Sequence, residues 1–254
     1  MESSVDPPKV VKLNVYPIKS CKALQVTEIE FDAFGVVGDR RFVMIDGNNR
    51  YLSQRRFGII ATVVAKIVVE NGRQLLCVSA PSMNWDLTIE PVVEGPRIDA
   101  NLWDCRVRLI DQGEEAARWC NELIGPDGAG AVRLVSTADG STVGEKYQRF
   151  VENIPESLKD RVSEIQVGLT NVSPVSLVSQ ESLVDLNEKM AQKRVNEISL
   201  DRFRMNIEVA GCSRSFEEDE WLVVRIGEVP FLVYEYCEVR VTTLFIAAIL
   251  IRWW

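Results

Sequence analysis

The stretch YPIKSCK (16–22) carries residues that could bind an anion. Pro17 is expected to end the strand before it, which places Lys19 and Ser20 on a loop at a strand end, where ligand contacts are common. A lysine ammonium beside a hydroxyl suits a phosphate or another anion. The alternative for this motif on its own is a solvated loop lysine.

Four arginines form a second group of candidate residues. They occur in GDRRF (38–42) and SQRR (53–56), which are expected to face each other across one hairpin. Guanidinium groups of like charge repel one another unless an anion lies between them. The group therefore indicates either an anionic ligand or separate pairing with surface carboxylates. The four residues are Arg40, Arg41, Arg55 and Arg56.

A third pair of candidates lies in DRFRMN (201–206). If this stretch is a strand, Arg202 and Arg204 share one face, and Asn206 points the same way as Arg204. Arg204 would then offer a fork of donors, and Asn206 an amide that both donates and accepts hydrogen bonds. This combination suits a heterocyclic ring with a phosphate tail.

The composition excludes several other kinds of site. The 254 residues include no histidine, which rules out Ser-His and Cys-His nucleophile systems, His-ligated metals and haem. The six cysteines include no CxxC pair, which argues against a zinc site and a disulfide scaffold and favours a reducing compartment. A net charge of −8 argues against a nucleic-acid-binding surface.

Strands must position most of these residues. Alternating apolar and polar residues predict a strand over 10–18. Asp-Gly and Asn-Gly pairs, which favour tight turns, predict hairpins over 40–53 and 61–80. A further strand is expected over 105–110.

Two helices are also expected. Apolar residues recur with helical spacing over 113–125, where Trp119 and Cys120 are interpreted as core residues. A second helix is expected over 180–193, with Ser179 as its N-cap.

The remaining segments complete the predicted organisation. Residues 137–165 are polar and weakly patterned and indicate a linker or lid. Strands are expected again over 203–210 and 221–243. Many strands and few helices, without βαβ alternation, predict an α+β fold that is predominantly β and barrel-like.

Six motifs resemble one family. They are, in order, YPIKSCK, GDRRFVMID, SPVSLVSQESLVDLN, RFRMNIEVAG, FEEDEW and a cysteine followed by TT. Together they are similar to the MOSC-domain proteins with an N-terminal MOSC β-barrel, and among these to the mitochondrial amidoxime-reducing components. The resemblance implies two β-barrel-like parts: an N-terminal domain over 8–130 and a MOSC domain over 166–254, joined by a linker or lid over 131–165.

The resemblance also implies a cofactor, molybdenum–molybdopterin, held between the two parts. Of the residues that match the family's cofactor contacts, Asn171 and Val172 would act through backbone groups. The full set is Lys19, Ser20, Arg40, Asn171, Val172, Arg204 and Asn206.

The sequence departs from the family at the metal ligand. The family pattern is CxRCxxT, and its second cysteine is the protein thiolate on molybdenum. Here the stretch is CEVRVTT, which aligns Val239 with the family's arginine and Arg240 with the ligand cysteine. A molybdenum–oxo centre needs a soft thiolate from the protein, and arginine cannot supply one. Cys237 could serve as the ligand only if the loop shifted.

The C-terminal stretch LFIAAILIRWW is a second departure. Its apolar run, Leu244 to Ile251, is far shorter than the roughly 20 residues that span a bilayer, so a strand or short helix on the core is expected instead of an anchor. The family continues through an acidic loop and further strands, so the MOSC domain is expected to be incomplete after a splice or frame change. No signal or transit peptide is visible, which favours a cytoplasmic protein.

The resemblance implies a molybdenum-dependent oxidoreductase that reduces small N-hydroxylated substrates. Its electrons would come from a haem and flavin partner protein, and mitochondrial association is implied as well. The alternative is a molybdopterin or sulfur carrier without turnover, or an inactive truncated product. MOSC domains also occur fused to pyridoxal-phosphate sulfurases, but no sulfurase half is visible here, so only the cofactor-handling part of that role transfers.

Overall fold

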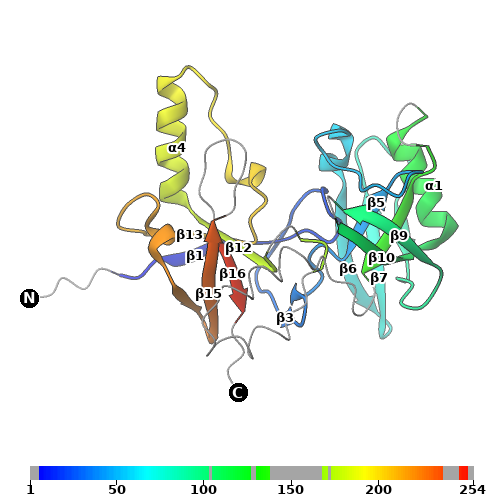
Figure 1. Cartoon of the computed structure of the whole chain (residues 1–254), viewed down its shortest axis with the longest axis horizontal. Coiled ribbons are helices and arrows are strands. Elements are labelled where there is room, and N and C mark those ends of the chain that lie inside the picture. Colours follow the sequence, from blue (N-terminus) through cyan, green and yellow to red (C-terminus); the bar gives the residue numbers. More distant parts are fainter. Residues whose placement is uncertain are drawn as a thin grey trace, which may run out of the picture.

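The computed structural model describes residues 6–102, 105–126, 130–137, 168–170, 173–236 and 246–250. Within these residues the chain forms two α-helices, α1 and α4, and sixteen strands in four sheets. The predicted α+β, predominantly β fold is confirmed. Figure 1 shows two lobes side by side, one containing α1 and the other α4.

The lobe that contains α1 is built on two sheets. The first has the strand order β5-β11-β10-β9, and the second has the order β6-β7-β8. Trp119 of α1 is fully buried in the hydrophobic core that these sheets share. The bounds are β5 (Phe42–Ile45), β6 (Val64–Glu70), β7 (Arg73–Ser79), β8 (Leu87–Ile89), β9 (Arg97–Leu102), β10 (Cys105–Asp111), α1 (Gly113–Ile124) and β11 (Arg133–Thr137).

The lobe that contains α4 is built on one seven-stranded sheet in the order β14-β15-β16-β12-β13-β1-β2. Helix α4 packs against β12 and β13. The bounds are β1 (Lys9–Val15), β2 (Leu24–Val26), β12 (Val175–Ser179), α4 (Gln180–Gln192), β13 (Ile207–Ala210), β14 (Val223–Ile226), β15 (Val229–Tyr236) and β16 (Ile246–Leu250). The short hairpin β3 (Phe31–Asp32) and β4 (Gly35–Val36) and the 3-10 helices Gly58–Thr62, Leu200–Arg202 and Glu217–Glu220 complete the described elements.

Strand β1 links the two lobes. It pairs antiparallel with β13, with Leu13 opposite Ile207. The first strand of the chain therefore belongs to the seven-stranded sheet of the lobe that contains α4, hereafter the C-terminal lobe (Figure 1). The loop after β1 then reaches the other lobe, where the Lys19 amide donates to the Phe42 carbonyl of β5 at 2.7 Å. The loop with the first candidate motif therefore lies where the lobes meet.

Local sequence signals are confirmed where short-range chemistry decides the structure. The hairpin predicted over 61–80 is formed by β6 and β7, and its turn residues Asn71 and Gly72 both have positive φ, at 51° and 77°. The first helix is α1, and its Trp119 and Cys120 are core residues with 0% exposure. In the second helix, α4, the Ser179 side chain accepts the N-cap hydrogen bond from the Ser182 amide at 3.1 Å.

Two strand predictions were wrong at their boundaries. The strand expected over 10–18 ends at Val15, before Tyr16 and Pro17. The strand expected over 203–210 begins only at Ile207, because the residues before it form the 3-10 helix Leu200–Arg202 and a turn. Over 221–243, where strands were expected, the described residues form two strands on either side of Gly227, whose φ is +59°.

The C-terminal segment contains a described strand, as the sequence predicts. Strand β16 lies in the sheet between β12 and β15, with Ala248 opposite Val175 and Ile249 opposite Leu232. Figure 1 shows β16 beside β15 and β12 in the left lobe. Among the helices of the described ranges, none is both long enough and apolar enough to cross a bilayer.

Gly35 allows the β3–β4 hairpin to contact the segment before β12. A Cβ atom at this position would lie 2.4 Å from the Pro174 Cβ, and the backbone φ of Gly35 is +99°. We expect Gly35→Ala to lower the free energy of unfolding by about 2–4 kcal/mol, because strain and overpacking add. Gly72→Ala is the matched control, since its φ is +77° but nothing lies within 4 Å. Equal losses in urea unfolding would contradict the steric argument.

The cysteines are expected to be thiols. Cys21, Cys77, Cys120 and Cys212 are free in the structure, and burial raises the pKa of the Cys120 thiol to about 12. Because the thiolate is the reactive form, Cys21 and Cys120 should resist thiol reagents until the protein unfolds. Titration of the denatured, non-reduced protein should count six thiols, the number in the sequence. A count of two or fewer would contradict a reducing compartment.

Candidate functional site

The loop after β1 places Lys19 inside the protein. Its amide is held by Phe42 of β5, and its ammonium Nζ donates to the Leu169 carbonyl at 2.8 Å. Lys19 is only 9% exposed, and its Nζ lies 6.0 Å from the centre of the Tyr51 ring. The alternative of a solvated loop lysine is therefore wrong. Ser20, also 9% exposed, follows with a left-handed backbone.

Arg40 joins the two lobes through its guanidinium group. The Arg40 Nη1 donates to Asp39 and, at 3.2 Å, to the Asn206 side-chain oxygen. Its Nη2 donates to the Arg204 carbonyl at 2.7 Å. The Asp39 carboxylate is buried and also accepts from the Tyr16 amide at 2.8 Å. One buried carboxylate thus fixes both the arginine and the end of β1.

Arg204 approaches the same loop from the other lobe. Its Nη1 donates to the Cys21 carbonyl at 2.5 Å and lies 3.5 Å from the Gln54 side-chain oxygen. Its Nη2 is buried and has no hydrogen-bond partner among the residues that the structure describes. A buried charged donor without an acceptor is unfavourable, so this atom indicates a site for a ligand that accepts hydrogen bonds.

Asn206 has a different role from the one that strand parity suggests. Its Oδ1 accepts from Arg40 and, at 3.1 Å, from the Ser176 hydroxyl, while its Nδ2 donates to the Asn14 carbonyl at 3.2 Å. Asn206 therefore ties β1, β12 and β13 together and orients Arg40. The prediction that Arg204 and Asn206 point together from one strand was wrong, because Arg204 lies in a turn with a φ of 62°.

Both guanidinium groups lie over one aromatic ring. The Cζ atoms of Arg40 and Arg204 are 4.5 Å and 4.4 Å from the centre of the Tyr16 ring. Tyr16 is 1% exposed, and its hydroxyl donates to the Met205 carbonyl at 3.3 Å. The ring face is electronegative, so it attracts both cations.

Positive charge exceeds negative charge in the described part of this network. Burial, and then Arg40 and Arg204, lower the pKa of Lys19 well below its ordinary value, and Asp39 acts in the opposite direction. Burial, and then Arg40, lower the pKa of Arg204 to about 10. The network therefore suits an anionic ligand, because a bound anion would offset repulsion among cations that water screens poorly.

Backbone strain is concentrated in the same place. Ser20, Arg40 and Arg204 have φ angles of 71°, 46° and 62°, in the left-handed region that non-glycine residues seldom adopt. Such residues cost about 1–3 kcal/mol each and occur frequently at ligand sites, where the surrounding structure holds them. Three candidate residues with this backbone support a binding role for the network.

The four arginines of the second group do not converge. Arg41 pairs with Asp32 at 2.6 Å, and Arg56 lies 3.5 Å from Asp46, while Arg55 is exposed. Pairing with separate carboxylates, the alternative for this group, applies to Arg41 and Arg56. Only Arg40 belongs to the network.

Sequence reasoning missed two members of the network. Tyr16 lies in the motif that supplied Lys19, and Asp39 directly precedes Arg40, so proximity in the sequence was the available signal. Neither residue could be chosen without the contacts that Tyr16 makes with both arginines. Five of the residues discussed above lie outside the described residues: Asn171, Val172, Cys237, Val239 and Arg240. A Cβ at Gly168, three residues before Asn171 in the chain, would lie 4.0 Å from the Arg40 carbonyl.

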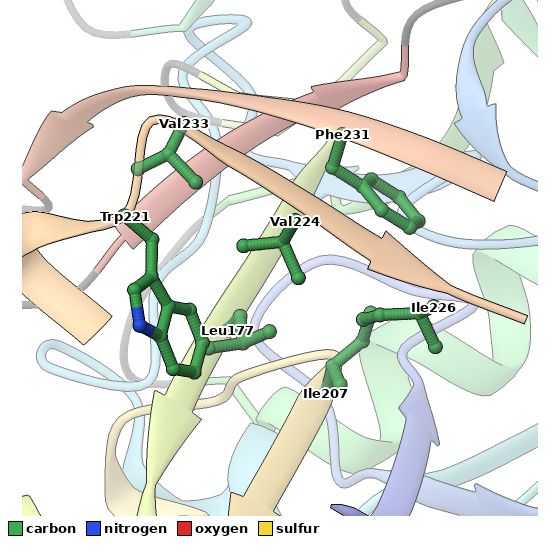
Figure 2. A pocket seen from close by; sticks show the side chains of 7 residues that line it. All are labelled: Leu177, Ile207, Trp221, Val224, Ile226, Phe231 and Val233. Atoms are coloured by element: carbon green, nitrogen blue, oxygen red, sulfur yellow. The ribbon is translucent and has the colours of Figure 1, made fainter. Parts of the chain in front are cut away.

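A pocket lies elsewhere in the C-terminal lobe. Figure 2 shows apolar side chains from β12 to β15 surrounding it, among them Leu177, Ile207 and Phe231, with Trp221 at one side. These residues belong to or pack against the hydrophobic core of this lobe. An apolar pocket does not suit a charged ligand, so the cationic network is the better candidate site.

Comparison with known families agrees with the motifs. Residues 7–127 match the MOSC N-terminal beta barrel domain, and residues 164–239 match the MOSC domain. Together the two matches span most of the chain and include every residue of the network.

Similar proteins occur in two groups. The chain is 30% identical over 233 residues to mitochondrial amidoxime reducing component 2 of Rattus norvegicus and 29% identical over 230 residues to that of Homo sapiens. Each match covers 87% of this chain and 61% of the relative, so the chain spans about three fifths of their length. It is 27% identical to the molybdenum cofactor sulfurase of Homo sapiens, over 93% of this chain and 26% of that protein.

One solved structure is weakly similar. The solution structure of a protein from Bordetella bronchiseptica has 19% identity and a TM-score of 0.33, over 44% of this chain and 89% of that one. A score this low does not establish a shared fold.

Proposed function

Because the chain belongs to the MOSC-domain proteins with an N-terminal MOSC β-barrel, we propose that it binds a molybdenum–molybdopterin cofactor. The cationic network between the lobes would hold the anionic part of this cofactor. The relatives named amidoxime reducing component and molybdenum cofactor sulfurase support a function associated with this cofactor.

The buried Nη2 of Arg204 is the observation that carries the proposal. This charged donor lacks an acceptor within the described residues, and it lies in a network where Lys19 and Arg40 add positive charge. Phosphate oxygens accept hydrogen bonds from guanidinium and ammonium groups in this kind of setting. The described residues therefore fit an anionic tail.

The protein's residues would bind and orient the cofactor. Arg204 and Lys19 would contact anionic oxygens, while Asp39 and Asn206 keep Arg40 in place between the lobes. Burial strengthens each of these contacts because little water competes. The cofactor would supply the redox chemistry itself, as such groups do in other enzymes. With no histidine in the chain, protons would come from water or carboxyl groups.

We propose an oxidoreductase that acts on small N-hydroxylated substrates, in line with the name of the first relatives. The family resemblance implies that electrons would come from a haem- and flavin-containing partner. Mitochondrial association would agree with the name of the same relatives. The cytoplasm remains the location expected from the sequence. These assignments concern a complete protein of which the chain spans about three fifths by comparison with its relatives.

A cofactor carrier without turnover is the second candidate. It is favoured by the match to molybdenum cofactor sulfurase and by Arg240, which stands where the family places its thiolate ligand. Molybdenum together with reduction of N-hydroxylated substrates would identify the enzyme. Pterin without turnover would identify the carrier, and neither would indicate an inactive product.

Pterin content after purification tests the proposed binding site. Arg204→Ala should retain about tenfold less pterin than the unaltered protein, since it removes charged hydrogen bonds to the cofactor. Arg202→Ala is the matched control, because Arg202 is exposed on the neighbouring 3-10 helix and should retain normal pterin. Fluorescence of the oxidised pterin gives the readout. Equal retention in the two variants would refute the site.

A further inference from the structure

Two like charges share one buried ring at the proposed cofactor site. Arg40 and Arg204 both place their Cζ within 4.5 Å of the Tyr16 ring centre, and Arg40 also donates to the Arg204 carbonyl. Without a bound anion, these guanidinium groups repel each other across a poorly hydrated space. Something in the protein must keep them near each other when no ligand is present.

Tyr16 is itself held from two sides. Its amide donates to Asp39 at 2.8 Å, and its hydroxyl donates to the Met205 carbonyl at 3.3 Å, next to Arg204 in the chain. Asp39 also binds Arg40, so the residue that fixes the start of the loop also fixes one of the two cations. The ring cannot move away from the guanidinium groups without breaking these contacts.

We propose that Tyr16 is a positioning residue whose ring holds both Arg40 and Arg204 in the unliganded protein, ready for an anionic group. The inference rests on the proposed function, because it assumes that these arginines bind an anion. A site arranged in advance binds more tightly, since binding need not order the side chains. Attraction of a desolvated cation to an aromatic face is strong enough to have a measurable effect.

Two substitutions separate the ring from the hydroxyl. Tyr16→Phe keeps the aromatic face and should bind inorganic pyrophosphate within about twofold of the unaltered protein. Tyr16→Leu keeps an apolar side chain but removes the face, and should bind about tenfold more weakly at low salt. Tyr16 is buried, so Tyr16→Leu could also lose affinity through misfolding, and a sharper comparison is needed.

Ring fluorination provides that comparison. Phenylalanine carrying one, two or three ring fluorines, incorporated at position 16, has nearly the same shape but a progressively weaker negative face. The pyrophosphate affinity should fall with each added fluorine, by about tenfold in total across the series. Thermal unfolding measured on the same samples verifies that each protein is folded.

The outcomes distinguish the inference from its premise. A fall in affinity that follows fluorine number, with stability unchanged, would support the positioning role. Affinity that is constant or rises with fluorination would overturn it, and the anion site would stand. If the unaltered protein fails to bind pyrophosphate, both the anion site and the role of Tyr16 are refuted.

Discussion

Replacing Arg240 by cysteine should raise the molybdenum content of the purified protein by about tenfold or more, because a thiolate is the soft ligand that the metal needs. The family resemblance aligns Arg240, in the stretch CEVRVTT, with the ligand cysteine of the family. A guanidinium group cannot donate an electron pair to the metal, and its positive charge repels it. Compared with this variant, the unaltered protein should therefore contain less molybdenum and reduce N-hydroxylated substrates more slowly.

The matched control is Arg240→Ser, which also removes the positive charge and is close to cysteine in size. It should leave the molybdenum content low, because a neutral hydroxyl is a poor substitute for a thiolate. The double variant Val239→Arg with Arg240→Cys restores the whole family pattern and should be loaded at least as well as the single one. Elemental analysis after expression with abundant cofactor measures all four proteins.

Cys237 is the alternative ligand. If the unaltered protein is fully loaded with molybdenum and Cys237→Ser removes the metal, Cys237 is the working ligand and the interpretation of Arg240 is wrong. If no variant gains metal while pterin is retained, the chain is better described as a cofactor carrier.

The predictable part of the fold is the part that neighbouring residues decide. An Asn-Gly pair between two apolar stretches determines the β6–β7 turn, and Ser179 caps α4, so both elements could be derived from short windows of sequence. The position of β1 could not, because its partner β13 lies almost 200 residues further along the chain, as in the pairing of Leu13 with Ile207. Periodicity describes a strand but does not identify its neighbour.

The candidate site shows the same division. Lys19, Arg40 and Arg204 were chosen by residue type and family resemblance, and the structure brings Arg40 and Arg204 together over the Tyr16 ring. The reasoning from strand parity at Arg204 failed, because a left-handed residue after a 3-10 helix reverses the chain where an alternating strand was assumed. Asp39 was missed because its value depends on Tyr16 and Arg40 at once, a contact pattern that spacing does not reveal.

The affinity of the site for sulfate should weaken as the pH rises, by up to about tenfold per pH unit, because binding requires a proton on Lys19. Sulfate is a suitable probe because its own charge does not change as the pH rises from neutral. Guanidinium groups of arginine keep their protons near neutral pH, whereas a buried lysine ammonium readily loses its proton. Among the residues that the structure describes, the charged groups that act on Lys19 are Arg40, Arg204 and Asp39.

The direction follows from the pKa of Lys19 in each state. Burial and the two arginines lower the pKa of Lys19 in the free protein, whereas a dianion beside the ammonium raises it. Below the lower pKa, the ammonium is already charged and the affinity is independent of pH. Between the two pKa values, sulfate binding takes up a proton, so the affinity falls as the pH rises.

The same shift affects the stability of the free protein. An unfolded lysine has a pKa of about 10.4, so between the lowered folded pKa and this value the unfolded chain binds more protons. Lys19 therefore makes the folded state more stable as the pH rises through this window, and the stability is lost again as the pH falls. Lys19→Met should remove this slope from urea unfolding and increase stability below the window.

Lys19→Arg decides whether Lys19 is the group responsible for the pH dependence of sulfate affinity. Arginine keeps its charge throughout the range, so this variant should bind sulfate with little dependence on pH between about 6 and 9. Lys19→Met should bind sulfate weakly and also without the slope. Calorimetry in two buffers of different ionisation enthalpy should detect proton uptake in the unaltered protein alone. A slope that persists unchanged in Lys19→Arg would assign the proton to another group and contradict the prediction.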